Sequence, residues 1–205
     1  MAKLLKKENI ISWFQWWSEF WPRALWFRSI LASPIKNKIK DRVNKIKSRE
    51  FRRPVAPSII EEYLSEYFET QNKSPFMTFS SIVKEDKKLV IPGVIHFDWT
   101  ARYHTVNELQ NKKYYDLLNE FHKITSIPVL INTSFNVRWQ PIVESPEDAI
   151  KTFLSTEIDY LVIWNYLVSK QEIYKEFIFD QSLVYLKTKY KEKKEQKLYL
   201  NKWNI

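Results

Sequence analysis

The stretch that decides the fold is Val129-Leu130-Ile131-Asn132-Thr133-Ser134-Phe135-Asn136-Val137-Arg138. Its apolar beginning predicts a strand over residues 127–132, and the small polar residues show where that strand ends. Hydroxyl, amide and guanidinium groups then follow within a few residues, and together they can donate hydrogen bonds to an anion. The same residues also fit a polar loop between a strand and a helix that satisfies its own turn hydrogen bonds. This stretch alone leaves both interpretations open.

The chain downstream of this stretch continues with a helix and a strand. Ser145 followed by Pro146 is a typical helix start, with Ser as the N-cap and Pro at the first helical position. It predicts a helix over 146–155, and the apolar residues after that predict a strand over 159–164.

Upstream, apolar spacing predicts a helix over 107–125 and another within the basic segment 36–53. Ser58-Ile59-Ile60-Glu61 has the spacing of a capping box and predicts a further helix. Helices and strands therefore mix along the chain, and we expect an α/β (α+β) fold with a mixed sheet.

The composition favours a folded domain with an anionic partner. The 205 residues include 33 Lys and Arg against 24 Asp and Glu, a formal net charge of +9. A positive protein attracts nucleotides, phosphorylated substrates, nucleic acids or membrane surfaces, and charge alone does not choose among them. No apolar run reaches the roughly 18 residues of a membrane span, and the N-terminus lacks the pattern of a secretory signal. We expect a cytoplasmic protein, and the absence of Cys excludes disulfides and thiolate chemistry.

Several common catalytic motifs are missing from the sequence. There is no Walker A loop, no GxGxxG fingerprint and no GxSxG nucleophile elbow. His96, His104 and His122 lack the spacing of metal ligands, so we predict no metal site within this chain. Ser134 has no base near it in the sequence, and we interpret it as a binding hydroxyl rather than a nucleophile.

Two other segments carry candidate phosphate ligands. Lys47, Arg49 and Arg53 lie in the most basic part of the chain, where Arg would bind phosphate through its fork and Lys as a point charge. The alternative for these charges is a solvated helix face. Arg102 comes soon after Asp98 and a predicted strand. It would either form a simple ion pair with Asp98 or act as a phosphate donor that Asp98 holds in place.

Three blocks of sequence resemble the C-terminal region of the O-carbamoyltransferases that modify nodulation factors and antibiotics. The first block contains Trp13-Phe14-Gln15, Glu19-Phe20, Pro22-Arg23-Ala24-Leu25 and Arg28-Ser29-Ile30-Leu31. The second contains Lys47-x-Arg49-Glu50, Arg53-Pro54 and Ala56-Pro57. The third combines Asp98 and Thr100-Ala101-Arg102 with the Asn132–Arg138 stretch and Pro146-Glu147-Asp148-Ala149. The blocks occur in the family's order, which makes the resemblance specific.

The resemblance implies a YrdC-like domain at 36–170, with a mixed twisted sheet flanked by helices. In this family the domain binds ATP and carbamoyl phosphate and forms carbamoyladenylate, and Mg²⁺ is expected with ATP. A preceding actin-like domain, which holds a metal of its own, then moves the carbamoyl group to a hydroxyl of the acceptor. By the same resemblance, 1–35 would be a linker from that domain. Residues 171–205 form a Lys-rich stretch that we interpret as an appended helical or partly disordered tail.

The resemblance also assigns roles to individual residues. The phosphate-binding and catalytic set would be Lys47, Arg53, Arg102 and Ser134. The nucleotide- and substrate-binding set would add Arg49, Asn132, Thr133, Asn136 and Arg138. Arg23 and Arg28 lie in the implied linker, where they would line the passage between the two domains.

The chain departs from the family in two ways. It begins inside the family's pattern, so the actin-like domain and its metal ligands are missing, and we expect at most the first half-reaction from this chain. It also contains 9 Trp and 1 Gly, whereas ordinary usage predicts roughly fourteen Gly. Trp stands where the family has Gly at Trp16, Trp21, Trp26, Trp99, Trp139 and Trp164. We hypothesise that the source reads UGA as glycine and that the sequence was translated with UGA as tryptophan.

Two other functions are alternatives at this point. The chain could be a non-catalytic remnant or interaction domain, or a basic module that binds nucleic acid through residues 36–53. Its aromatic residues fall mostly on core faces or at the positions where the family has Gly. No stacking platform for bases is evident, so nucleic acid is not the expected partner.

Overall fold

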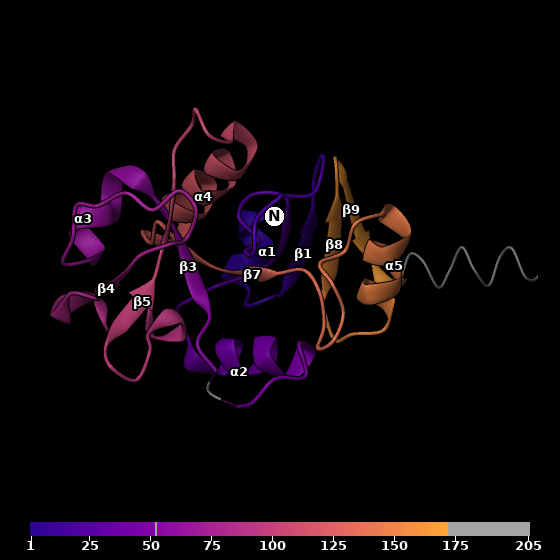
Figure 1. The fold of residues 1–205 in the computed structure, drawn as a ribbon, viewed down its shortest axis with the longest axis horizontal. Coiled ribbons are helices and arrows are strands. Elements are labelled where there is room, and N and C mark those ends of the chain that lie inside the picture. Colours follow the sequence, from indigo (N-terminus) through magenta and orange to yellow (C-terminus); the bar gives the residue numbers. More distant parts are fainter. Residues whose placement is uncertain (52, 172–205) are drawn as a thin grey trace, which may run out of the picture. The chain divides into compact units, whose positions relative to one another are not determined.

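A computed structural model describes residues 1–51 and 53–171 of the chain. Its compact unit spans Met1–Leu167 (Figure 1). The helices of the described residues are α1 (Ala2–Lys6), α2 (Asn37–Ile46), α3 (Leu64–Tyr67), α4 (Lys112–Thr125) and α5 (Pro146–Leu154), with 3-10 turns η1 (Glu61–Tyr63), η2 (Glu85–Lys87) and η3 (Pro92–Val94). The strands are β1 (Ile11–Phe14), β2 (Arg28–Ala32), β3 (Ala56–Ile60), β4 (Ser80–Ile82), β5 (Thr100–Arg102), β6 (His104–Val106), β7 (Val129–Ser134), β8 (Tyr160–Ile163) and β9 (Tyr166–Ser169).

Seven of these strands form one mixed sheet in the order β6-β3-β7-β2-β1-β8-β9. β7 pairs antiparallel with both β2 and β3, whereas β1 pairs parallel with β8 and β3 pairs parallel with β6. β4 and β5 form a separate antiparallel pair. α4 packs against β3 and β7, and α5 packs against β1 and β8. The predicted α/β (α+β) class, a mixed sheet flanked by helices, is therefore confirmed.

α4 leads the chain into β7. The helix begins after Asn111, whose side chain accepts a hydrogen bond from the Tyr114 N–H, and it ends at Ser126 in the left-handed conformation. Its apolar face buries Tyr114, Leu117, Leu118 and Phe121. The chain then turns into β7, whose residues Val129–Ile131 are fully buried. Burial on both faces holds this strand rigidly, so the polar residues at its end have a fixed position.

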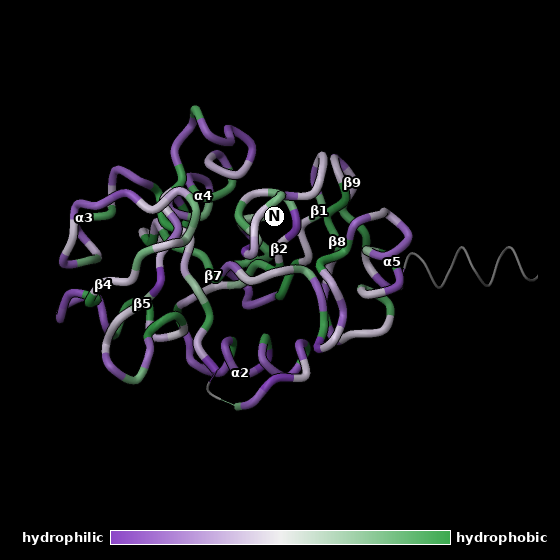
Figure 2. Tube along the Cα trace, viewed as in Figure 1, coloured by the Kyte–Doolittle hydropathy of each residue, from purple (hydrophilic) through white to green (hydrophobic). Residues whose placement is uncertain are grey.

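The basic segment predicted at 36–53 forms α2 and the loop after it. α2 packs through Ile39, Val43 and Ile46, and it is otherwise mostly hydrophilic, as Figure 2 shows. Several of its cations pair with carboxylates from other parts of the compact unit. These ion pairs are Lys38–Glu8 at 2.7 Å, Arg42–Asp159 at 3.0 Å and Lys45–Glu157 at 2.8 Å. The pairs neutralise part of the charge that made nucleic acid an alternative partner.

The structure places three other predicted segments. Residues 1–35, predicted as a linker, supply α1, β1 and β2, and both strands lie inside the sheet. The helix predicted to start at Ser58 is wrong, because Ser58 is a buried residue of β3 and helical backbone begins only at Glu61. The Ser58 hydroxyl lies 2.9 Å from His104 Nδ1 and accepts from Asn132 at 2.9 Å, instead of capping a helix. The predicted tail lies, from residue 172 onward, outside the described residues.

Arg28 joins β2 to the chain that precedes α5. Its side chain is 2% exposed, and its guanidinium lies 3.6 Å from the centre of the Phe14 ring. The guanidinium donates to the carbonyls of Gln15, Trp16 (3.0 Å), Val143 (3.2 Å) and Glu144 (3.4 Å). Burial lowers the pKa of Arg28, opposed by the charges of Glu19 and Glu144. A buried cation whose donors all point at backbone carbonyls has a supporting role in the fold.

Replacing Arg28 tests that role. Arg28→Met leaves several buried carbonyls without a donor, and we expect the free energy of unfolding to fall by about 2–4 kcal/mol. Arg23→Met changes an exposed arginine and should stay within about 0.5 kcal/mol of the parent. Urea unfolding measures both variants, and equal stabilities would contradict the role assigned to Arg28.

Candidate anion-binding site

A cavity of about 350 Å³ lies where the loop after α2 meets the end of β7 and the turn that follows it. It is lined by Lys47, Arg49, Glu50, Arg53, Ser134, Asn136, Val137, Arg138, Trp139 and Gln140. Six of these were predicted as site residues: Lys47, Arg49, Arg53, Ser134, Asn136 and Arg138. Residues from two distant blocks of sequence therefore meet in one cavity, which we call the Lys47 pocket.

Lys47 is the most buried cation of this pocket. It is 4% exposed, and its amine lies within hydrogen-bonding distance of four oxygen atoms. Two are the carbonyl and hydroxyl of Ser134, the hydroxyl at 3.2 Å, and two are the carbonyl and side-chain oxygens of Asn136, at 2.9 and 2.7 Å. None of the four belongs to a carboxylate, so these contacts fix the position of the amine without neutralising its charge.

Burial and the nearby positive charges lower the pKa of two cations of the pocket. Burial, together with repulsion from the positive charges of Arg49 and Arg53, lowers the pKa of Lys47 to about 6. Burial also lowers the pKa of Arg49 to about 10, with repulsion from Arg53 and a smaller opposing attraction from Glu50. With a pKa near 6, the Lys47 amine is mostly neutral at pH 8. A bound anion would favour the charged amine and raise its pKa.

The turn after β7 is held by its own side chains. The Ser134 hydroxyl donates to Asn136 Oδ1 at 2.7 Å, and Asn136 Nδ2 donates to the Gln140 carbonyl at 2.7 Å. Gln140 in turn accepts from the Val137 N–H at 3.2 Å and donates to Thr152 of α5 at 2.8 Å. This polar loop therefore satisfies many of its own hydrogen bonds, as one interpretation of the sequence predicted, and it also lines the cavity. Donation of hydrogen bonds to an anion stays a prediction.

Arg49 and Arg53 supply the other cations near Lys47. Arg49 donates to the Thr133 hydroxyl at 3.4 Å, while its buried Nε atom has no hydrogen-bond partner. Arg53 pairs with Glu50 at 3.1 Å, and Glu50 is the one carboxylate that lines the pocket. Three arginines and Lys47 line the pocket with one carboxylate, so positive charge is in excess even while the Lys47 amine is neutral. A buried guanidinium N–H without a partner is the kind of donor that a phosphate oxygen would satisfy.

Arg23 and Arg102 form a second pair of predicted cations. Arg102 is the last residue of β5. Burial lowers its pKa, and repulsion from Arg23 makes a smaller contribution in the same direction. Its buried Nε also has no partner. The predicted pairing of Arg102 with Asp98 is wrong among the described residues, because Asp98 accepts instead from the Thr100 N–H and hydroxyl, at 3.1 and 2.7 Å. The structure thus leaves Arg102 next to a second arginine rather than a carboxylate.

Asn132 is placed away from the Lys47 pocket. It is fully buried, and its Nδ2 donates to the Leu25 carbonyl at 2.8 Å and to Ser58 at 2.9 Å. Like Arg28, it ties strands and loops together. Of the predicted residues, these two are positioned as supports.

Glu19 is a residue whose role the sequence did not reveal, although it lies within the first block. A single carboxylate oxygen of Glu19 accepts hydrogen bonds from three successive backbone N–H groups: Leu25 at 3.2 Å, Trp26 at 2.6 Å and Phe27 at 2.6 Å. These bonds close the loop that carries Arg23. The spacing of six to eight residues has no motif, and a surface carboxylate would look the same in the sequence.

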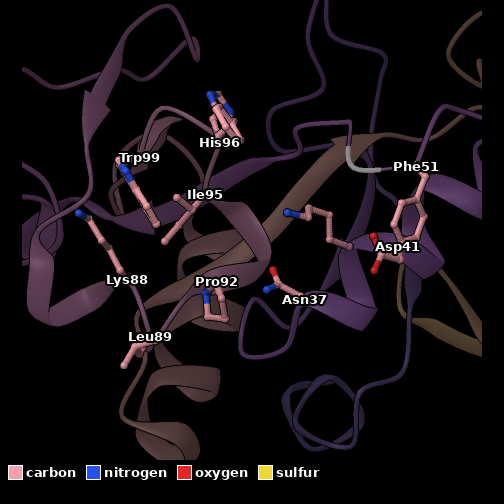
Figure 3. Close-up of a pocket in the computed structure, with 11 residues that line it drawn as sticks. Asn37, Asp41, Phe51, Lys88, Leu89, Pro92, Ile95, His96 and Trp99 are labelled. Carbon is pink, nitrogen blue, oxygen red and sulfur yellow. The ribbon is translucent and has the colours of Figure 1, made fainter.

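A second cavity, of about 720 Å³, lies between α2 and the η3 segment. Figure 3 shows the residues that line it: Asn37, Lys40, Asp41, Phe51, Lys88, Leu89, Pro92, Ile95, His96, Phe97 and Trp99. Phe51 lines this cavity while Glu50 and Arg53 line the Lys47 pocket. The loop after α2 therefore contributes to both cavities.

Residues 1–51 and 53–171 contain neither a metal-binding cluster nor a membrane-spanning helix. No group of three or more His, Asp or Glu side chains in these ranges is placed to hold a metal ion. None of the helices that the structure describes combines the length and the apolar character needed to cross a membrane.

The mixed sheet flanked by helices has a counterpart among solved structures. A solved structure with the same fold, full-length HypF in the phosphate- and nucleotide-bound form, aligns with 80% of this chain and 24% of its own. The TM-score is 0.55 and the sequence identity 16%, so this match shows the fold alone.

The chain belongs to the carbamoyltransferase C-terminus family, whose model matches residues 2–170. It is 47% identical over 174 residues to nodulation protein NolNO of Sinorhizobium fredii (strain NBRC 101917 / NGR234) and 49% identical over 166 residues to nodulation protein NolO of Bradyrhizobium diazoefficiens. These alignments cover 83% and 79% of this chain but only 26% and 30% of the relatives. The resemblance inferred from the sequence blocks is confirmed, and the chain spans less than a third of these curated relatives.

The pKa of Lys47 predicts that anion binding takes up a proton. Sulfate is a suitable probe because it does not titrate between pH 6 and 10. Above pH 6 the free amine is mostly neutral, whereas the sulfate-bound amine should be charged up to a higher pH. The affinity for sulfate should therefore fall as the pH rises from 7 to 9, by up to about tenfold per unit.

Calorimetry in buffers with different ionisation enthalpies measures this proton uptake directly. Lys47→Met should bind sulfate more weakly and without pH dependence. Lys45→Met changes a lysine that pairs with Glu157 outside the pocket and should behave as the parent does. A parent protein whose sulfate affinity is constant from pH 7 to 9 would contradict the neutral Lys47 amine.

Glu19 should protect the three amides that it accepts from. Hydrogen bonds to a charged acceptor contribute about 1.5–3 kcal/mol each, so Glu19→Ala should speed exchange of the Leu25–Phe27 amides by about tenfold or more. Glu19→Gln keeps an acceptor and should give a smaller increase. Glu120→Ala removes an exposed ion pair on α4 and serves as the control. Unchanged amide exchange in Glu19→Ala would show that the loop does not need this carboxylate.

Proposed function

We propose that this chain supplies the nucleotide and carbamoyl phosphate site of an O-carbamoyltransferase and forms carbamoyladenylate there. An actin-like domain, outside this chain, would then transfer the carbamoyl group to a hydroxyl of a small molecule or glycan. The observation that carries the proposal is the Lys47 pocket, where six residues assigned by the family resemblance line one cavity. Membership in the carbamoyltransferase C-terminus family supports the same reaction.

The charge of the pocket suits the chemistry of this reaction. Forming carbamoyladenylate from ATP and carbamoyl phosphate consumes one water and releases pyrophosphate and phosphate, so it brings two polyanions together. Lys47, Arg49, Arg53 and Arg138 would offset their repulsion and stabilise charge that develops on the phosphoryl oxygens. Ser134 and Asn136 would orient the substrates by hydrogen bonds, and Arg23 with Arg102 would bind a further phosphate group. Positioning of this kind needs no covalent step by the protein.

Magnesium would enter this site on the nucleotide. The pocket has one carboxylate, Glu50, which is already paired with Arg53. Mg²⁺ prefers an octahedron of oxygen ligands, and the described side chains of the pocket do not supply one. The ATP phosphates, rather than a site built by this chain, would therefore hold the ion. Use of ATP also supports a cytoplasmic location.

The transfer step needs parts that this chain does not cover. The relatives NolNO and NolO are more than three times longer than the regions that match. A metal-holding actin-like domain, encoded upstream or supplied by another chain, is therefore part of the proposal. A non-catalytic remnant would keep the fold but has no need for a pocket in which cations outnumber carboxylates.

Exchange of pyrophosphate into ATP, dependent on carbamoyl phosphate, tests the proposal. The assay uses the protein with tryptophan at all nine positions of the sequence, and a second form with glycine at the six tryptophan positions that differ from the family. We expect exchange by at least one form, reduced about 100-fold or more by Lys47→Met because a positioned cation is lost.

Lys45→Met is the matched control for this assay, because Lys45 lies two residues away and outside the Lys47 pocket. Its exchange rate should equal that of the parent. Failure of both parent forms to exchange pyrophosphate would count against the proposed function.

A further inference from the structure

Tryptophan occupies a backbone conformation that ordinarily belongs to glycine. Among the described residues, eight that are not glycine have positive φ, and four of these are tryptophan. Their φ angles are 35° at Trp16, 64° at Trp99, 64° at Trp139 and 53° at Trp164. In this region the Cβ atom crowds the following carbonyl, and a bulky side chain there is a genuine outlier. Four such outliers of one residue type call for a common cause.

The tryptophan rings at these positions gain little in return. They are between 44% and 90% exposed, so burial of the rings does not offset the backbone cost. The single glycine of the chain, Gly93, does not have a positive φ. It is required by close packing instead, because a Cβ there would lie 2.8 Å from the Pro34 carbonyl oxygen. Four left-handed positions of a kind that usually holds glycine thus hold tryptophan instead.

Trp13 shows what a well-placed tryptophan looks like in this fold. It lies in β1, is 2% exposed, and donates from Nε1 to the Trp26 carbonyl at 2.7 Å. Trp21 and Trp26 are not among the residues with positive φ, so their backbone makes no demand for glycine. The backbone therefore separates four positions from the other tryptophans.

Two of the four positions lie at the cavities described above. Trp139 lines the Lys47 pocket, and the Arg138 guanidinium lies 5.1 Å from the centre of its ring. Trp99 lines the larger cavity (Figure 3), with the Lys88 amine 4.5 Å from its ring centre. Each ring therefore occupies the wall of a cavity and engages a cation of the same region through a cation–π contact.

We propose that positions 16, 99, 139 and 164 are glycine in the functional protein, translated from UGA codons, and that glycine at 139 releases Arg138 to bind an anion in the Lys47 pocket. The second half rests on the proposed function, since it assumes that the pocket binds phosphate groups. The first half depends only on the backbone and the exposure of the rings. Replacing Trp139 with glycine removes the ring that the Arg138 guanidinium contacts.

Mass spectrometry of peptides from the protein isolated from its native source tests the first half directly. We expect glycine at positions 16, 99, 139 and 164 and tryptophan at position 13. Tryptophan at the four positions in the native protein would overturn the proposal. This readout does not depend on ATP or carbamoyl phosphate, so it stays separate from any failure of the pyrophosphate exchange assay.

Recombinant variants test the physical argument. Each of Trp99→Gly and Trp139→Gly should raise the melting temperature by about 2–8 °C, because the left-handed conformation no longer carries a Cβ. Trp13→Gly removes a buried ring from β1 and should lower it. A fall in melting temperature for both left-handed positions would overturn the argument from backbone conformation.

Sulfate binding tests the second half. Trp139→Gly should bind sulfate about tenfold more tightly than the chain as written, a gain typical of one added charge-assisted contact. Adding Arg138→Met to that variant should abolish the gain, whereas adding Lys151→Met, on α5 and outside the pocket lining, should leave it intact. A gain that persists without Arg138, or no gain at all, would overturn the role given to Arg138.

Discussion

The amine of Lys47, enclosed by oxygens of Ser134 and Asn136, is the interaction on which the site depends. It joins the end of α2 to the end of β7, two elements that lie 87 residues apart in the chain. Because its acceptors are neutral, the contact positions a cation without cancelling its charge. Burial next to Arg49 and Arg53 then makes the charged form of Lys47 unfavourable. The same contact therefore orders the site and leaves the Lys47 amine without a negatively charged partner.

The sheet makes this contact possible by fixing β7 from both sides. β7 lies between β2 and β3, and its first residues are fully buried. Arg28 and Asn132 add hydrogen bonds between the strands and the loops that surround them. A rigid strand that ends in polar residues places those residues precisely enough to orient a substrate. The fold and the pocket are thus parts of one arrangement, in which the buried supports matter as much as the residues that face the cavity.

Local patterns predicted some elements and not others. The capping box at Ser145 is present in α5, because both of its hydrogen bonds form between neighbours in sequence. The similar pattern at Ser58 failed, because pairing of β3 with β7 and β6 is stronger than a local cap and gives Ser58 partners 46 and 74 residues away. The pocket could be anticipated only through the family resemblance. Sequence could not separate Arg28, whose acceptors are distant carbonyls, from an arginine that faces a ligand.

The backbone conformation and the surroundings of each tryptophan are evidence about these positions that does not depend on the family resemblance. If the tryptophans had accumulated by drift, they would not be expected to coincide with left-handed backbone, which few residues of a fold adopt. Four of them do coincide with it, while Trp13, in extended backbone, is buried and hydrogen-bonded as a native tryptophan should be. Trp26 is informative in another way, since its buried Nε1 has no partner. A residue that leaves its polar atom unsatisfied at the edge of a core cluster fits the site poorly, even where its φ angle is ordinary. The strain is therefore concentrated at four positions, and two of them, Trp99 and Trp139, line the two cavities.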